Sequence, residues 1–86
     1  MDPYSVIIRP DVTERSMKLV ESENKLVFIV SRTASKRDIK SSFEKLYDVE
    51  VKDVNTLMSP KGFKKAYIQL GEKHKADELA TRIGIF

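Results

Sequence analysis

The sequence contains no cysteine, which excludes disulfide bonds, thiolate metal sites and a cysteine nucleophile. Its only glycines are Gly62, Gly71 and Gly84, so a glycine-rich phosphate-binding loop is also missing. A membrane-spanning helix needs a run of about 20 apolar residues, and the chain has no such run. No signal peptide is recognisable at its start, and we therefore expect a cytoplasmic protein.

Catalytic groups are equally scarce. The one histidine, His74, lies between Lys73 and Lys75, and no partner is placed to make it a metal ligand or a general base. The adjacent carboxylates Asp77 and Glu78 would point in different directions on a helix, which makes them a poor acid–base pair. We therefore predict that the protein is not an enzyme and has no catalytic residue, no metal and no cofactor.

The charge of the chain is mildly basic but unevenly distributed. Sixteen basic and thirteen acidic residues give a net charge of +3, which by itself says little about partners. Residues 24–37 and 59–71 contain cations and no acid, whereas most acids lie in residues 11–23, 48–53 and 72–78. This distribution favours a molecule with a basic side and an acidic side; the alternative is an ordinary solvated surface.

The chain is organised around five consecutive apolar residues, from Leu26 to Val30. The run is short and rich in β-branched and aromatic types, which is typical of a strand. Successive side chains of a strand point to opposite faces, and here both faces are apolar. We therefore predict a central strand that is covered on both sides.

Six further elements are expected around this strand. They are an edge strand or extended arm over 5–9, a helix over 11–21, a helix over 36–47, strands over 49–58 and 64–70 joined by a turn at 59–62, and a helix over 74–83. In the first hairpin strand the apolar alternation changes phase near Lys52 and Asp53, which predicts a β-bulge.

Local signals support the helix boundaries. Ser35 and Asp38 have the spacing of a capping box at the start of the second helix. For the first helix, either Asp11 or Thr13 is a candidate cap. Its rough apolar stripe is formed by Val12, Met17, Leu19 and Val20.

The predicted elements combine into a single domain, residues 1–86. A strand–helix–strand crossover followed by a hairpin can place the last strand between the other two. The expected fold class is therefore α+β, a ferredoxin-like split β-α-β arrangement with a four-stranded, mainly antiparallel sheet and three helices.

The hairpin turn is the best candidate for a binding site. From Pro60 to Lys65 it combines three cations with Phe63, and cations that neutralise phosphates beside a stacking aromatic are typical of RNA-contacting loops. The alternative is a lysine-rich turn that protects an edge strand. The spacing from Phe63 to Tyr67 does not fit the RNA-recognition-motif signature, and we reject that motif.

Segments along almost the whole chain together resemble one known family. They are Ile8-Arg9-Pro10, Val12-Thr13-Glu14-Arg15-Ser16, Asn24-Lys25-Leu26, Ala34-Ser35-Lys36 with Ile39-Lys40, Val54-Asn55-Thr56-Leu57, Lys64-Lys65-Ala66-Tyr67 and Arg82-Ile83-Gly84-Ile85-Phe86. Each segment alone is a weak signal, but their combination is specific. The chain resembles the large-subunit ribosomal protein family numbered twenty-three, and its short turn and its ending resemble the archaeal form.

The resemblance implies a structural protein of the cytoplasmic ribosome that binds large-subunit ribosomal RNA, contacts neighbouring ribosomal proteins and forms part of the polypeptide exit-tunnel rim. It also implies docking of the signal recognition particle or a nascent-chain factor, and the family's docking glutamate falls on Glu14. Bacterial members carry a long basic loop between the hairpin strands, whereas Met58 to Lys64 leaves only a tight turn here. We expect no membrane insertion and no obligate homo-oligomer.

We expect RNA contacts from ten basic or hydrogen-bonding residues: Arg9, Thr13, Lys18, Lys36, Lys40, Asn55, Thr56, Lys61, Lys64 and Lys65. The leading alternative is a ferredoxin-like module that binds a small ligand or oligomerises. Such a module would need a pocket at a sheet edge or a dimer seam, and it would have no affinity for RNA.

Overall fold

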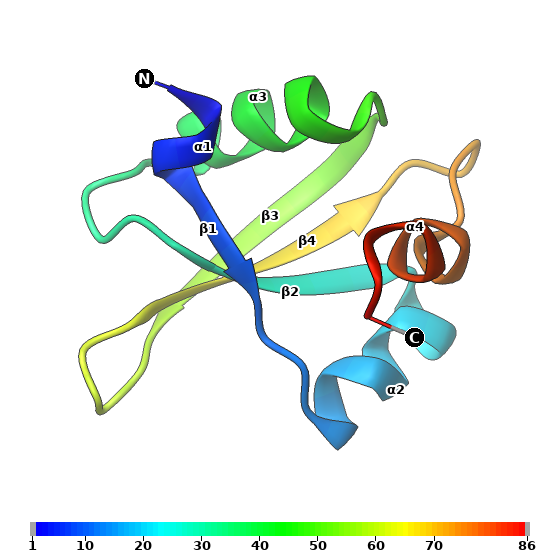
Figure 1. Ribbon diagram of the computed structural model, residues 1–86, viewed down its shortest axis with the longest axis horizontal. Helices are drawn as coiled ribbons and strands as arrows, with labels where there is room; N and C mark the ends of the chain where they lie inside the picture. The colour runs from blue at the N-terminus through cyan, green and yellow to red at the C-terminus, as the bar shows by residue number, and fades with distance from the viewer. Residues whose placement is uncertain (1, 86) are drawn as a thin grey trace.

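The computed structural model describes residues 2–85, which form four helices and four strands (Figure 1). In chain order these are α1 (Pro3–Val6), β1 (Ile7–Pro10), α2 (Glu14–Glu23), β2 (Lys25–Val30), α3 (Lys36–Tyr47), β3 (Val51–Met58), β4 (Lys64–Leu70) and α4 (Ala76–Ile83). The predicted domain, 1–86, includes Met1 and Phe86, which lie outside the described residues. Phe86 also ends the segment 82–86 that resembles the family.

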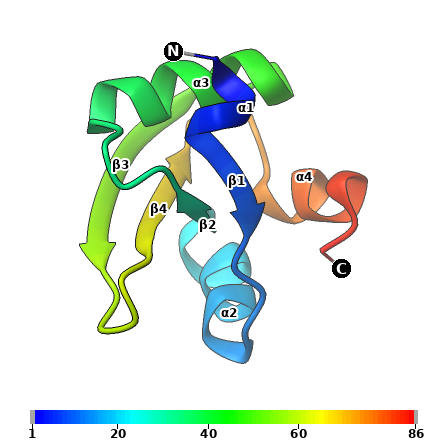
Figure 2. The ribbon, with the colours of Figure 1, turned by 60° about the vertical axis from the view of Figure 1, so that its left-hand side comes forward.

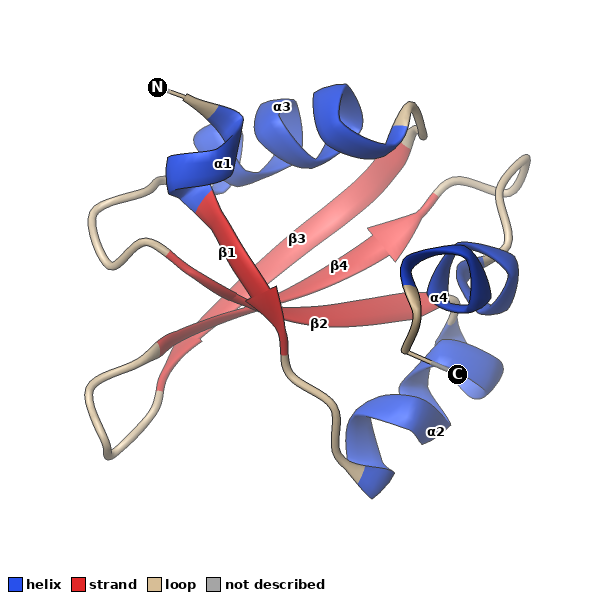
Figure 3. Cartoon of the chain, viewed as in Figure 1, coloured by secondary structure: helices blue, strands red, loops and turns tan. Residues whose placement is uncertain are grey.

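The strands form one antiparallel sheet in the order β1-β2-β4-β3 (Figure 3). Helix α3 connects β2 to β3, and β4 lies between these two strands. The predicted α+β class and split β-α-β arrangement are therefore confirmed. The expected bulge is also present, because the register between β3 and β4 shifts between Val51 and Asp53.

Strand β2 lies inside the sheet, paired with β1 on one side and with β4 on the other. All its side chains from Leu26 to Val30 are buried, as the apolar run predicts. Alternation directs Leu26, Phe28 and Val30 into the main core. Val27 and Ile29 are buried on the opposite face.

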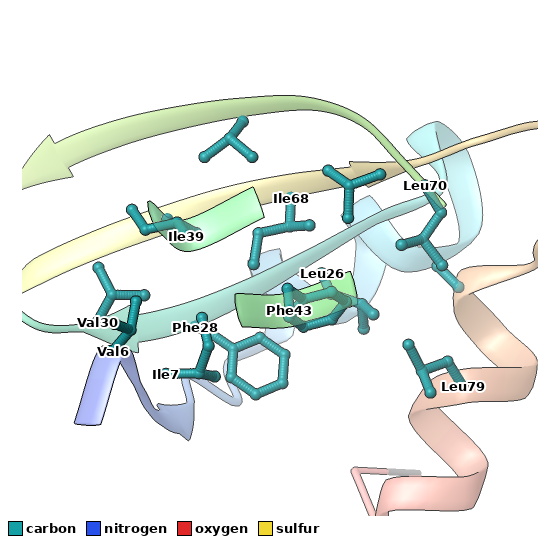
Figure 4. Packing of buried hydrophobic residues seen from close by; sticks show 14 of the residues in the cluster. Val6, Ile7, Leu26, Phe28, Val30, Ile39, Phe43, Ile68, Leu70 and Leu79 are labelled. Atoms are coloured by element: carbon teal, nitrogen blue, oxygen red, sulfur yellow. The ribbon is translucent and has the colours of Figure 1, made fainter. Parts of the chain in front are cut away.

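The main core lies between the sheet and α3, with Phe28 and Phe43 in contact, and α1, α2 and α4 also contribute buried side chains to it (Figure 4). Their ring centroids are 5.3 Å apart at an interplanar angle of 73°, the edge-to-face geometry that aromatic pairs prefer. Tyr47 extends this cluster at 4.7 Å from the ring of Phe43. Burial there raises the pKa of Tyr47 above its ordinary value.

Helix α3 has the predicted bounds and the predicted capping box. The N–H of Asp38 donates to the hydroxyl oxygen of Ser35 at 3.1 Å, and the N–H of Ser35 donates to the Asp38 carboxylate at 3.0 Å. These hydrogen bonds favour the charged carboxylate and lower the pKa of Asp38. Two orphan donors at the helix start are thereby satisfied.

The prediction for the N-terminal segment was partly wrong. Residues 3–6 form the short helix α1, and the strand begins only at Ile7. Asp2 caps this helix by accepting the N–H of Tyr4 at 3.0 Å. Pro3 occupies the first helical position, where its fixed backbone angle and missing N–H are favourable. The structure thus adds a fourth helix to the three expected.

Helix α2 begins at Glu14, later than the predicted start at residue 11. Its cap is Thr13, one of the two predicted candidates, which forms a capping box with Ser16. Asp11 has another role, since its carboxylate pairs with Lys65 of β4 at 3.0 Å. The helix then continues to Glu23, two residues beyond the expected end.

The apolar stripe expected on α2 is only partly buried. Val20 joins the main core and Leu19 is half-buried. Val12 and Met17 are exposed, by 50% and 37%, so their prediction as part of a packed stripe was wrong. The reason is that Val12 precedes the helix and Met17 lies on its outer side.

Asn24 holds three elements together at one end of the sheet. It ends α2 in the left-handed conformation, with φ of 55°. Its side-chain amide donates to the carbonyls of His74, at 2.9 Å, and Leu70, at 3.4 Å, and its Oδ1 accepts the N–H of Ala76 at 2.7 Å. Lys75, at the cap position of α4, gives no side-chain cap. Asn24 therefore caps α4 from a distant part of the chain, and α4 starts at Ala76, two residues after the expected start.

Replacing Asn24 should weaken the fold through the loss of these hydrogen bonds alone. Asn24→Gly keeps the left-handed backbone accessible, so we expect the free energy of unfolding to fall by about 1–3 kcal/mol. Asp48→Gly is the matched control, because Asp48 ends α3 with φ of 53°. Urea unfolding of both variants gives the comparison. Equal stability changes in the two variants would contradict the role assigned to Asn24.

Candidate nucleic-acid interface

The two faces of the sheet are covered unequally. Helices α1 and α3 lie beside each other on one side of the sheet (Figures 1 and 2). On the other side, the first turns of α2 approach Val27 and Tyr67. These two side chains, Thr13 and Leu19 line a cavity of about 90 Å³. Farther from α2, Asn55 of β3 is exposed. This second side is therefore open over β3.

Cross-strand pairs define which side chains share this open side. Arg9, Ile29, Lys65 and Leu57 form one row across the sheet, because each is paired with the next. Val27, Tyr67 and Asn55 form the neighbouring row. The side chains of these rows and of the adjoining turn that reach solvent, at least in part, form the "open face": Arg9, Asn55, Leu57, Phe63, Lys65 and Tyr67.

Two cations of the open face have fixed partners. The guanidinium carbon of Arg9 lies 5.7 Å from the centre of the Phe63 ring, a cation–π distance. The ammonium of Lys65 lies 3.0 Å from the carboxylate of Asp11, and both side chains are mostly buried. These contacts orient both basic groups beside exposed apolar surface.

The hairpin turn is as short as the sequence predicts. The N–H of Ser59 donates to the carbonyl of Phe63 at 2.7 Å, and the N–H of Gly62 donates to the carbonyl of Ser59 at 2.9 Å. Gly62 has φ of 90°, a backbone conformation that favours glycine. Lys61 is exposed in this turn, which stands clear of the helices in both ribbon views (Figures 1 and 2).

A second group of cations lies on the α3 side. Lys36, Arg37 and Lys40 of α3 and Lys52 of β3 line one hollow together with Asp53. This group of four cations is named the α3 surface. Lys36 and Lys40 were predicted from the sequence, whereas Arg37 and Lys52 were not. Arg37 belongs to the acid-free segment 24–37, which was a usable signal, whereas Lys52 joins the group only through the tertiary fold.

The remaining candidates are placed elsewhere. Thr56 and Lys64 lie opposite Ala66 and Val30, on the core side of the sheet. The ammonium of Lys64 donates to the carbonyl of Ala34 at 2.6 Å and so holds the loop between β2 and α3. The structure therefore does not gather the ten candidates into one patch: three lie on the open face, two on the α3 surface, and the others around them.

The start of α2 presents Glu14 to solvent. Thr13 caps the helix, and the Glu14 side chain is 90% exposed. Its carboxylate lies 4.0 Å from the ammonium of Lys18, which is also exposed. Such a surface pair contributes little to stability. Both charges therefore remain accessible to a partner.

Within residues 2–85, no group of three or more metal-binding side chains is present. No helix in this part of the chain is long and apolar enough to cross a membrane.

Comparison with known proteins gives consistent matches. Residues 5–78 match the protein family described as ribosomal protein L23. The chain is 51% identical to a protein of Methanococcus aeolicus, 49% identical to one of Methanococcus maripaludis strain S2 and 46% identical to one of Methanothermobacter thermautotrophicus. Each alignment covers the whole of both chains, and each relative is named large ribosomal subunit protein uL23.

Proposed function

The chain belongs to the ribosomal protein L23 family, and from this premise we propose that it binds large-subunit ribosomal RNA directly and forms part of the polypeptide exit-tunnel rim. As a family member it is a structural constituent of the large subunit of the cytoplasmic ribosome, and it is not an enzyme. Its partners are accordingly the RNA and the proteins of that subunit. This membership favours the ribosomal role over a small-ligand-binding or oligomerisation module.

One observation carries the proposal of direct RNA binding. Arg9 and Lys65 lie in one row of the open face, beside the exposed ring of Phe63. Basic side chains neutralise phosphates and release counterions, and an exposed aromatic ring can stack on a base. Asn55 adds hydrogen-bonding groups in the neighbouring row. This combination suits RNA better than it suits an apolar small molecule.

The α3 surface supplies a second set of cations for the same RNA. Lys36 and Lys40 project from α3, and Lys52 comes from the edge strand β3. Because the open face and the α3 surface lie on opposite sides of the sheet, β3 separates them. We propose that the RNA passes both sides of this edge and contacts Arg9, Asn55, Lys61 and Lys65 on one side and Lys36 and Lys40 on the other. The other four candidates, Thr13, Lys18, Thr56 and Lys64, lie outside these two surfaces.

For the exit-tunnel rim, the proposed docking residue is Glu14. The exposure of this carboxylate supports contact with a basic partner such as the signal recognition particle or a nascent-chain factor. The neighbouring exposed side chains of Val12 and Met17 add apolar surface to the same end of α2. A charged group beside an apolar patch suits a protein partner.

Removal of two α3 cations should weaken RNA binding through charge. For the double variant Lys36→Ala, Lys40→Ala we expect lower affinity for a large-subunit ribosomal RNA fragment. The slope of log K against log salt should fall by roughly 0.7–0.9 for each phosphate that is no longer neutralised. Lys75→Ala is the control, since Lys75 lines a hollow with Glu21 and Asp77. Filter binding over a salt series measures both quantities, and salt-insensitive binding of the unaltered chain would refute the mechanism.

Charge reversal at Glu14 should separate docking from assembly. Ribosomes carrying Glu14→Arg should contain normal amounts of the protein, because Glu14 has only an exposed partner. They should bind the signal recognition particle at least about tenfold more weakly, the effect of losing roughly 1.4 kcal/mol. Co-sedimentation measures this, with Glu78→Arg at the start of α4 as the matched control. Docking that is unchanged in Glu14→Arg would reject the assignment.

A further inference from the structure

The open face carries two aromatic side chains, Phe63 and Tyr67, that electrostatic binding of phosphates does not require. Phe63 is 44% exposed and lies outside the main core. Tyr67 is half-buried, in the same row as the exposed Asn55. Both rings lie on the same side of β4 as Lys65, because side chains two residues apart in an extended chain share a face.

The two rings do not contribute to the main core. The core of the same chain buries Phe28 and Phe43 completely, whereas Phe63 remains in solvent beside the Arg9 guanidinium. A large exposed aromatic next to a cation is typical of a binding surface. Leu57, 56% exposed in the same row as Lys65, extends the apolar area.

The spacing of the rings limits what they can hold. Phe63 and Tyr67 are four positions apart in extended chain, which corresponds to about 13 Å. Two rings at that distance contact two different bases and cannot sandwich a single one. Lys65 lies between them in sequence, on the same side, but its ammonium is already paired with Asp11. The Arg9 guanidinium beside Phe63 is therefore the cation better placed to neutralise a phosphate that connects neighbouring nucleotides.

Resting on the proposed RNA-binding function, we propose that the open face binds unpaired nucleotides, whose bases stack on Phe63 and Tyr67. Arg9 neutralises an adjoining phosphate, Lys65 shares its charge between such a phosphate and Asp11, and Asn55 hydrogen-bonds a base edge. Double-stranded RNA cannot be bound in this way, because its bases are already stacked on one another and its grooves present mainly phosphates and 2′-hydroxyls. The α3 surface has cations without an exposed aromatic and is suited to that backbone.

The placement of these aromatic residues differs from that in the RNA-recognition motif. In that motif, aromatics at fixed spacing on two neighbouring strands stack the bases. Here both aromatics come from β4 and its turn, and the neighbouring strand contributes Asn55 and Leu57. The open face is therefore a proposed base-stacking surface whose aromatic residues have a different spacing from those of that motif.

The test compares two RNAs and four variants of the full chain. The probes are a short single-stranded oligoribonucleotide of mixed sequence and the same strand annealed to its complement. Phe63→Leu and Tyr67→Leu keep apolar volume but remove the aromatic ring, and Phe63→Trp keeps a ring. Tyr4→Ala is the matched control, because Tyr4 is an exposed aromatic of α1, which packs against α3 on the other side of the sheet.

We expect the unaltered chain to prefer the single strand. Phe63→Leu and Tyr67→Leu should each bind it about 5- to 100-fold more weakly, the effect of losing one stacked base, with an unchanged salt slope. Phe63→Trp should retain affinity. Because the chain has no other tryptophan, the emission of Phe63→Trp should be quenched by the single strand and much less by the duplex. Tyr4→Ala should bind both RNAs as the unaltered chain does.

The possible failures are distinguishable. If Phe63→Leu and Tyr67→Leu bind the single strand normally, or if the duplex binds as tightly as the single strand, the stacking proposal is wrong, although direct RNA binding stands. If the unaltered chain binds neither RNA in a salt-dependent manner, the proposed function fails, and the stacking proposal fails with it.

Discussion

The packing of α3 against a single face of the sheet is the constraint on which the rest of this structure depends. Phe43 packs against Phe28, and Ile39 is buried in the same core, so this face of the sheet is covered. Because side chains alternate along a strand, burial of Ala66 on one side of β4 requires Lys65 to point to the other. The fold thereby produces a face on which cations and aromatic rings stand together, and α2 covers only part of it.

Much of this fold follows from local sequence signals. The bounds of α3 were predictable because the pairing of Ser35 with Asp38 and a continuous apolar stripe agree on them. The bulge was predictable because a strand that changes phase must change register. Helix α1 was missed because Pro3 marks a strand boundary as readily as a helix start. The capping of α4 by Asn24 was beyond sequence reasoning, since donor and acceptor are 52 residues apart.

The candidate site was less predictable than the fold. Composition identified the cations, but only the strand register brings Arg9 into one row with Lys65. Lys64 and Lys65 are equivalent in composition, yet one holds a loop through the carbonyl of Ala34 and the other belongs to the open face. Lys52 joins the α3 surface through a contact between β3 and α3 that no local pattern encodes. Surface chemistry therefore depends on tertiary placement more than on residue type.

The proposed function requires that RNA contacts both sides of β3 and leaves Glu14, at the start of α2, free for other partners. Mapping of backbone amide chemical shifts during titration with a large-subunit ribosomal RNA fragment tests it most directly. We expect large changes along β3, β4 and the first turns of α3, and little change at Glu14 or within α4. Changes that centre on α2 and α4, or that spread evenly over the surface, would contradict it.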